Sequence, residues 1–187
     1  MPTDTQATRK DDLTDFLSRT AAKERAKIEK HLATVDAHDD GVHGKLWRRL
    51  ALMLDALSGA GVESSSGQAW RFFIPDGKYR MQVFALEDRG DGMLRIVLPD
   101  VLEQAVARKI IGKTKVPGEY TVPSSREVLH IEAIDPSKTQ DPPAHVKSML
   151  GWGRRAIQIT ISTVGDNKPL EAAQKMCEMA AKQFVKA

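Results

Sequence analysis

Apolar and polar residues alternate along the stretch from residue 68 to residue 99, QAWRFFIPDGKYRMQVFALEDRGDGMLRIVLP. An alternation with a period of two predicts β-strands that bury one face. Two turn signals interrupt it, Pro75-Asp76-Gly77 and the pair Gly90 and Gly92. We therefore predict a three-stranded antiparallel meander, and we expect the rest of the chain to be organised around it.

The turns also predict how these strands pair. If Asp76 and Gly77 are the central residues of the first turn and 88–91 form the second loop, Arg95 stays out of the core. The predicted pairs are then Ile74–Tyr79, Phe72–Met81, Trp70–Val83, Leu94–Ala85, Ile96–Val83 and Leu98–Met81. The opposite face carries the only constellation that suggests binding: Arg71, Phe73, Arg80, Gln82, Phe84 and Arg95.

Helical periodicity surrounds the meander. Residues 10–35 and 46–57 predict an N-terminal helical hairpin, ended by Gly59 or Gly61 as a C-cap. The first of these helices could pack on the domain or pair with a partner or a second copy. The elements expected after the meander are a helix at 101–111, an edge strand at 120–122, a strand at 127–134, a helix at 141–155, a strand at 157–162 and a C-terminal helix at 170–184.

The fold class predicted from this order is α+β: an antiparallel sheet built on a three-stranded meander, flanked by helices, with an N-terminal helical hairpin. Residues 1–9 lack apolar periodicity and are expected to form a disordered tail. The hairpin then covers 10–61, the serine-rich stretch 62–67 is the best linker, and 68–187 form the α+β domain. With 187 residues and 41% hydrophobic content, one core is expected.

Composition indicates a cytoplasmic protein. The chain has no apolar run long enough to span a membrane, and its N-terminus lacks the apolar segment of a signal peptide. Its single cysteine, Cys177, excludes an internal disulfide framework and falls on the apolar stripe of a helix, where a thiol is usually inert. The net charge is only +3, with the excess in residues 64–115, so a polyanion partner is permitted and not required.

No motif predicts an enzyme, a metal site or a cofactor. Gly112-Lys113-Thr114 matches the end of a phosphate-binding loop, but Ala107 stands where that motif needs glycine. The dense set His38, Asp39, Asp40 and His43 could ligate a metal but lies in a glycine-broken turn without defined geometry. No nucleophile, base and orienting group can be named together. His31 and His145 are expected at solvated helix positions, and Trp47, Trp70 and Trp152 are expected to be packing residues.

The polar face of the predicted sheet has two interpretations. Arginines interleaved with aromatic rings can hold phosphates and stack bases, which favours single-stranded nucleic acid. The strands that bear His130 and Glu132, and Gln158 and Thr160, would extend that surface. Alternatively the face is solvated and ion-paired, for instance Arg95 to Glu132, with its phenylalanines covered by the N-terminal helices. The leading hypothesis is a non-enzymatic protein-interaction or adaptor module, with a homodimer as one form; nucleic-acid binding is the alternative.

Overall fold

A computed structural model describes residues 13–37, 42–65, 69–102, 118–121, 128–134, 144, 146–147, 155–162 and 169–184. Its helices are α1 (Thr14–Arg19), α2 (Ala22–Asp36), α3 (Val42–Ser58) and α6 (Pro169–Phe184). Its strands are β1 (Val62–Ser65), β2 (Ala69–Asp76), β3 (Tyr79–Asp88), β4 (Met93–Pro99), β5 (Gly118–Thr121), β6 (Val128–Ile134) and β7 (Ala156–Ser162). None of the helices described is long and apolar enough to cross a membrane.

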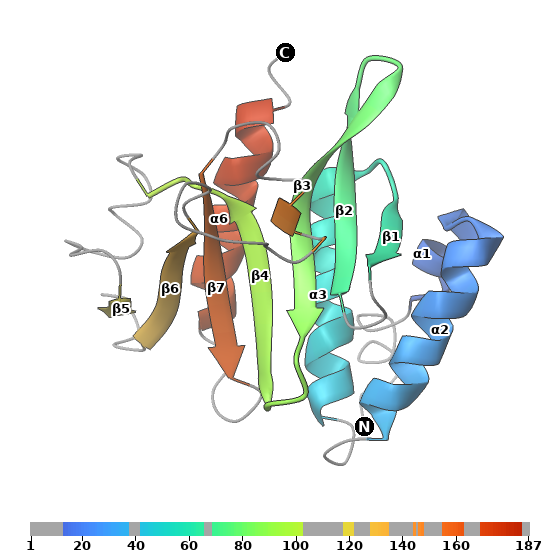
Figure 1. Ribbon diagram of the computed structural model, residues 1–187, viewed down its shortest axis with the longest axis horizontal. Coiled ribbons are helices and arrows are strands. Elements are labelled where there is room, and N and C mark those ends of the chain that lie inside the picture. Colours follow the sequence, from blue (N-terminus) through green and yellow to red (C-terminus); the bar gives the residue numbers. More distant parts are fainter. Residues whose placement is uncertain are drawn as a thin grey trace, which may run out of the picture.

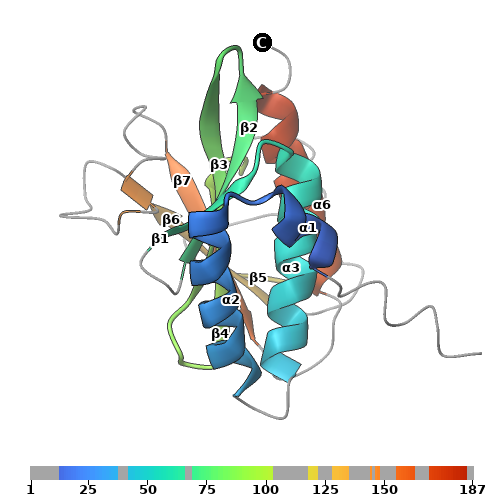
Figure 2. The same cartoon turned by 90° about the vertical axis from the view of Figure 1, so that its right-hand side faces the viewer.

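The seven strands form one antiparallel sheet in the order β1-β2-β3-β4-β7-β6-β5 (Figure 1). Helices α3 and α6 cover one face of this sheet, and α2 lies beside its β1 end (Figure 2). This arrangement confirms the α+β prediction, including the meander, the N-terminal helices and the helix at the C-terminus. It also confirms the edge position of the strand near Tyr120, since β5 ends the sheet.

The main core lies between the helices and the sheet. At its N-terminal end, α1, α2, α3 and β2 each contribute one ring to a cluster centred on Trp70. Phe16 stacks on Trp70, and His31 and Trp47 also pack against it. Trp47 and Trp70 pack edge to face with their centroids 5.1 Å apart, and His31 meets Trp47 at 4.7 Å. Both indoles are completely buried, which confirms that they are packing residues. Four rings from four elements therefore join the N-terminal helices to the sheet.

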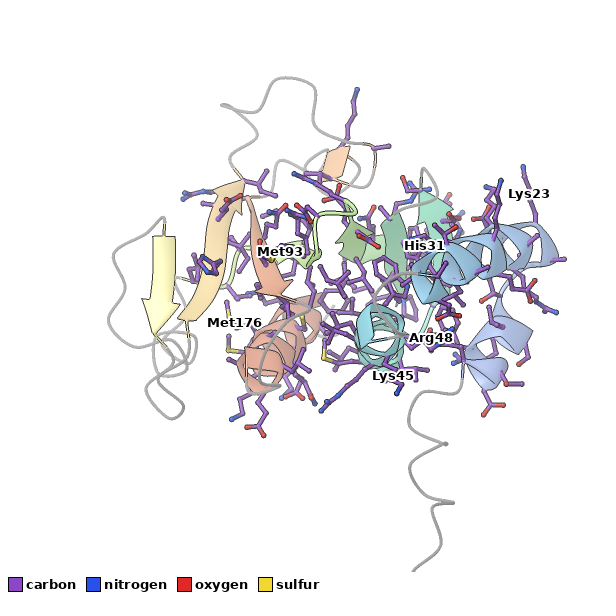
Figure 3. The ribbon with its side chains drawn as sticks, turned by 90° about the horizontal axis from the view of Figure 1, so that it is seen from below. Lys23, His31, Lys45, Arg48, Met93 and Met176 are labelled. Carbon is purple, nitrogen blue, oxygen red and sulfur yellow. The ribbon has the colours of Figure 1, made fainter. Side chains whose placement is uncertain are left out.

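The solvated position predicted for His31 is wrong. His31 is only 6% exposed, and it points inward from α2 while Lys23 points outward (Figure 3). The reason is helical spacing, because Ile28, Leu32 and Val35 share its face of α2 and are buried with it. His145 and Trp152 lie outside the described residues.

The predicted first helix is two helices. Thr20 and Ala21 have extended backbone angles between α1 and α2, and the Thr20 hydroxyl donates to the carbonyl oxygen of Phe16 at 2.9 Å. The break allows Phe16 of α1 and Ile28 of α2 to face one core. The apolar stripe of α2 therefore packs within the chain, which is one of the two roles expected for the first predicted helix.

The predicted linker contains a strand instead. β1 pairs with β2 along its length, and α2 packs against it. The Ser64 backbone N–H donates to the Glu24 carboxylate of α2 at 2.8 Å, and Ser64 and Ser65 are buried. The serines were expected to form a linker because they offer little side chain to bury, whereas here they pair with β2 and are buried. Whether the hairpin and the α+β domain fold separately stays a prediction, and residues 1–9 lie outside the described part of the chain.

The predicted register of the first hairpin is wrong by two residues near the turn. Asp76 faces Tyr79, so Gly77 and Lys78 form the turn, and Gly77 has a positive φ of 57°. A β-bulge follows: Phe73 faces Gln82 and Phe72 faces Phe84, which leaves Val83 as the extra residue. The bulge turns Phe84 into the core and Ala85 to the opposite face, contrary to the prediction.

The second loop is longer than predicted, because five residues, 89–93, separate the paired Asp88 and Leu94. The longer loop and the β-bulge both change which residues of β3 face β4. Together they leave the predicted residues of β4 pointing into the core. Leu94, Ile96 and Leu98 are completely buried, and Arg95 lies on the other face. Of the two further helices predicted, 103–111 lies outside the described residues and only 144, 146 and 147 of the second are described.

Helix ends and the single thiol agree with the sequence. α3 stops at Ser58, and Gly59, with φ 76°, donates its N–H to the Asp55 carbonyl oxygen at 2.9 Å. Cys177 of α6 is completely buried, and burial raises the pKa of its thiol. A thiol held in its neutral form is a poor nucleophile, so the packing role predicted for Cys177 is confirmed.

Candidate interaction surface on the sheet

Cross-strand pairing gathers polar side chains on the face of the sheet that α3 and α6 leave uncovered. One row runs through the pairs Glu87–Arg95, Arg95–Thr160 and Thr160–His130, and a second through Glu63–Arg71 and Gln158–Glu132. The polar face, as we use the term, consists of Glu63, Arg71, Phe73, Arg80, Gln82, Glu87, Arg95, His130, Glu132, Gln158 and Thr160. Five of the six predicted site residues lie on it, and the extension by β6 and β7 is confirmed; Phe84 does not belong to it.

Two arginines enclose a phenylalanine at the β1–β2 end of this face. The guanidinium carbon of Arg80 lies 4.3 Å from the ring centroid of Phe73, and that of Arg71 lies at 5.9 Å. Both guanidinium groups pair with one carboxylate, Glu63: Arg71 Nη2 donates to Oε2 at 2.8 Å, and Arg80 Nη2 pairs with Oε1. Cation–π contacts and charge-assisted hydrogen bonds therefore fix both arginines, and Phe73 is 9% exposed beneath them. We call Glu63, Arg71, Phe73 and Arg80 the Phe73 cluster.

Arg95, near the middle of the face, is paired within its own hairpin. Its Nη1 and Nη2 donate to the two carboxylate oxygens of Asp91 at 3.1 and 2.5 Å. This bidentate hydrogen bond raises the pKa of Arg95, with smaller contributions from the nearby charges of Glu87 and Glu132. The predicted partner of Arg95, Glu132, instead accepts a hydrogen bond from Gln158 at 3.3 Å.

The ion pair of Asp91 predicts a dependence of stability on pH. The hydrogen bond from Arg95 lowers the pKa of Asp91 below its ordinary 3.8, so the folded chain keeps this carboxylate charged where the unfolded chain would protonate it. Its contribution is complete above roughly pH 5 and is lost as the pH falls through the lowered pKa. We expect urea unfolding to show stability falling on acidification, and Asp91→Asn to show a shallower fall. An identical pH profile for the variant would contradict this.

The middle of the sheet face is apolar. Ala85, Val97 and Ala156 point to this side and are completely buried, in contact with Val146 from the connection between β6 and β7. Val146 lies on the side of the sheet opposite α3 and α6. This small apolar centre is therefore covered by the chain itself, and charged residues surround it. The polar face carries three of the chain's arginines and three of its glutamates.

The sequence analysis missed Glu63 and Asp91, the carboxylates that pair with these arginines. Glu63 was assigned to a linker, although Val62, Glu63 and Ser64 alternate in burial as a strand would. Within the described residues, no group of three or more His, Cys, Asp or Glu side chains could hold a metal ion. The turn with His38, Asp39 and Asp40, the His43 side chain and the loop at Gly112 lie outside what the structure describes.

Comparison with known proteins adds no assignment: no family model matches the chain, and neither a curated protein nor a solved structure matches it significantly. We therefore infer the function from the geometry of the chain itself, and in particular from the polar face.

Proposed function

We propose that this protein is a non-enzymatic interaction module that binds another protein, or a second copy of itself, through the polar face of its sheet. The observation that carries the proposal is the difference between the two faces of the sheet. The apolar stripes of α2, α3 and α6 are buried against the sheet in one cluster. On the opposite face the apolar centre is buried within the chain, and charged and polar side chains such as Arg80, His130 and Glu132 are exposed around it. Such side chains are typical of the polar rim of protein–protein interfaces.

Nucleic-acid binding is the weaker alternative. A phosphate backbone would need several available arginines along the face, whereas Arg95 in its middle is held by both carboxylate oxygens of Asp91. A phosphate backbone crossing this face would also approach Glu87 and Glu132, at an unfavourable electrostatic energy. A partner with both charges, such as another protein, meets no such barrier.

Peptide selection tests this proposal. Random linear peptides would be selected on phage against the full chain, and the selected peptides mapped by amide NMR shifts. We expect the shifts to centre on the accessible residues His130, Glu132 and Thr160, and Thr160→Arg to weaken binding at least about tenfold through steric and charge conflict at the interface. The control is Glu171→Arg on the exposed side of α6, which should bind normally.

Two results would contradict the proposal. One is a set of peptides that maps to α3 and α6, because the functional surface would then be the helical layer. The other is binding of a single-stranded oligonucleotide that weakens steeply with salt and that Arg71→Ala and Arg80→Ala reduce, which would favour the nucleic-acid alternative. Light scattering on the full chain distinguishes a foreign partner from a second copy.

A further inference from the structure

The Phe73 cluster holds more hydrogen-bond donors than its own carboxylate uses. Each guanidinium group carries five N–H donors, and Glu63 pairs with a single nitrogen of each arginine. Arg71 Nε is buried and has no hydrogen-bond partner. Two positive charges around one negative charge leave an excess of one. The cluster is therefore neither electrostatically neutral nor saturated with hydrogen bonds.

The cluster is also accessible and held in place before any ligand arrives. The Arg80 side chain is 44% exposed and that of Arg71 is 25% exposed, so both reach solvent from the sheet. Stacking on Phe73 and pairing with Glu63 restrict their rotamers, which reduces the entropy that a ligand must remove on binding. A planar guanidinium presents its donors in a geometry that matches a carboxylate.

We propose that the Phe73 cluster is a docking site for a carboxylate side chain in an acidic segment of the partner protein. The proposal rests on the function proposed above and names the chemistry of the partner. In the free protein, Glu63 occupies part of the site. The carboxylate of the partner would bind beside Glu63 or in its place. Charge complementarity favours a single carboxylate, because it needs only this cluster. A polyphosphate strand would extend to the balanced charges around Arg95 and Glu87.

The probe is a blocked dodecapeptide that alternates glutamate with valine, compared with the same peptide carrying glutamine for glutamate. Binding to the full chain is followed by anisotropy and by the Nε–H NMR signals of its arginines. We expect the signals of Arg71 and Arg80 to move, the glutamine peptide to bind at least about tenfold more weakly, and Arg80→Ala to weaken the glutamate peptide by a similar factor. Arg49→Ala, an exposed arginine of α3, is the matched control and should bind as the unmodified chain does.

A gain of affinity gives the decisive variant. Glu63→Gln keeps the side-chain shape and removes the internal carboxylate, so we expect about tenfold tighter binding of the glutamate peptide. A variant that failed to fold would lose affinity for the peptide, so it would not be mistaken for this gain. Equal binding of the two peptides, unmoved Arg71 and Arg80 signals, or no gain in Glu63→Gln would each overturn the proposal. So would a single-stranded oligonucleotide that moves the same signals at lower concentration than the glutamate peptide.

These outcomes are separable from failure of the interaction function itself. If the peptides selected on phage bind the polar face without a carboxylate and leave Arg71 and Arg80 unmoved, the carboxylate site is wrong while the interaction module stands. If the selected peptides bind only the helical layer, the function proposed for the polar face is wrong as well.

Discussion

A chain that begins at Val62 is expected not to fold. Helices α1, α2 and α3 cover Trp70, Phe72 and Phe84, each of which is completely buried in the full chain. Exposing such side chains costs about 1.5–3 kcal/mol each, and the three together approach the whole stability of an ordinary domain, about 5–15 kcal/mol. Circular dichroism and amide NMR dispersion of the 62–187 fragment should show no cooperative unfolding.

The control for this truncation removes residues 1–9, which the sequence predicts to be a disordered tail. That shorter deletion should leave the urea midpoint unchanged. If the 62–187 fragment instead unfolded cooperatively, the hairpin and the sheet would be separate domains, as the division at 61 implies. The same experiment therefore decides the domain organisation.

Replacing Phe84 by alanine should lower the free energy of unfolding by about 3–5 kcal/mol, because it leaves a cavity in the main core. The sequence-based register places Phe84 on the polar face, where its removal would affect binding more than stability. Urea denaturation measures the difference directly. Thr160→Ala, on the polar face, is the comparison and should change stability by at most about 0.5 kcal/mol.

A small loss for Phe84→Ala, below about 1 kcal/mol, would contradict the β-bulge at Val83. It would return Phe84 to the surface and restore the uninterrupted alternation that the sequence suggests. A large loss with unchanged slope of the denaturation curve would support the bulge, since the variant would then lose stability without altering the surface exposed on unfolding.

Much of the fold follows from hydrophobic periodicity. The alternation of Leu94, Ile96 and Leu98, and that of Ile157, Ile159 and Ile161, predicts the inward face of two central strands, and these residues are buried. Periodicity does not locate a bulge, because Val83 and Phe84 are both apolar and either could point inward. Their adjacency is the only trace that the bulge leaves in the sequence.

The site could be predicted only in part, for a related reason. The arginines of the polar face follow from strand alternation, but their partners come from elsewhere in the chain. Glu63 lies on a strand whose serines suggest a loop, and Asp91 lies in a turn whose length sets which side chain it reaches. Ion pairing depends on these distances, so the sequence shows which charges exist and the structure shows which of them are neutralised.

The hydrogen bond between Glu24 and the Ser64 backbone has a consequence for self-aggregation. An exposed β-edge is a template on which strands of other molecules can add, and repeated addition leads to fibres. At β1, the carboxylate from α2 occupies an amide that an incoming strand would need, and it offers negative charge where the newcomer's carbonyl oxygen would have to bind. Loss of the Glu24 side chain would therefore free the Ser64 N–H and make the addition of a foreign strand at β1 easier.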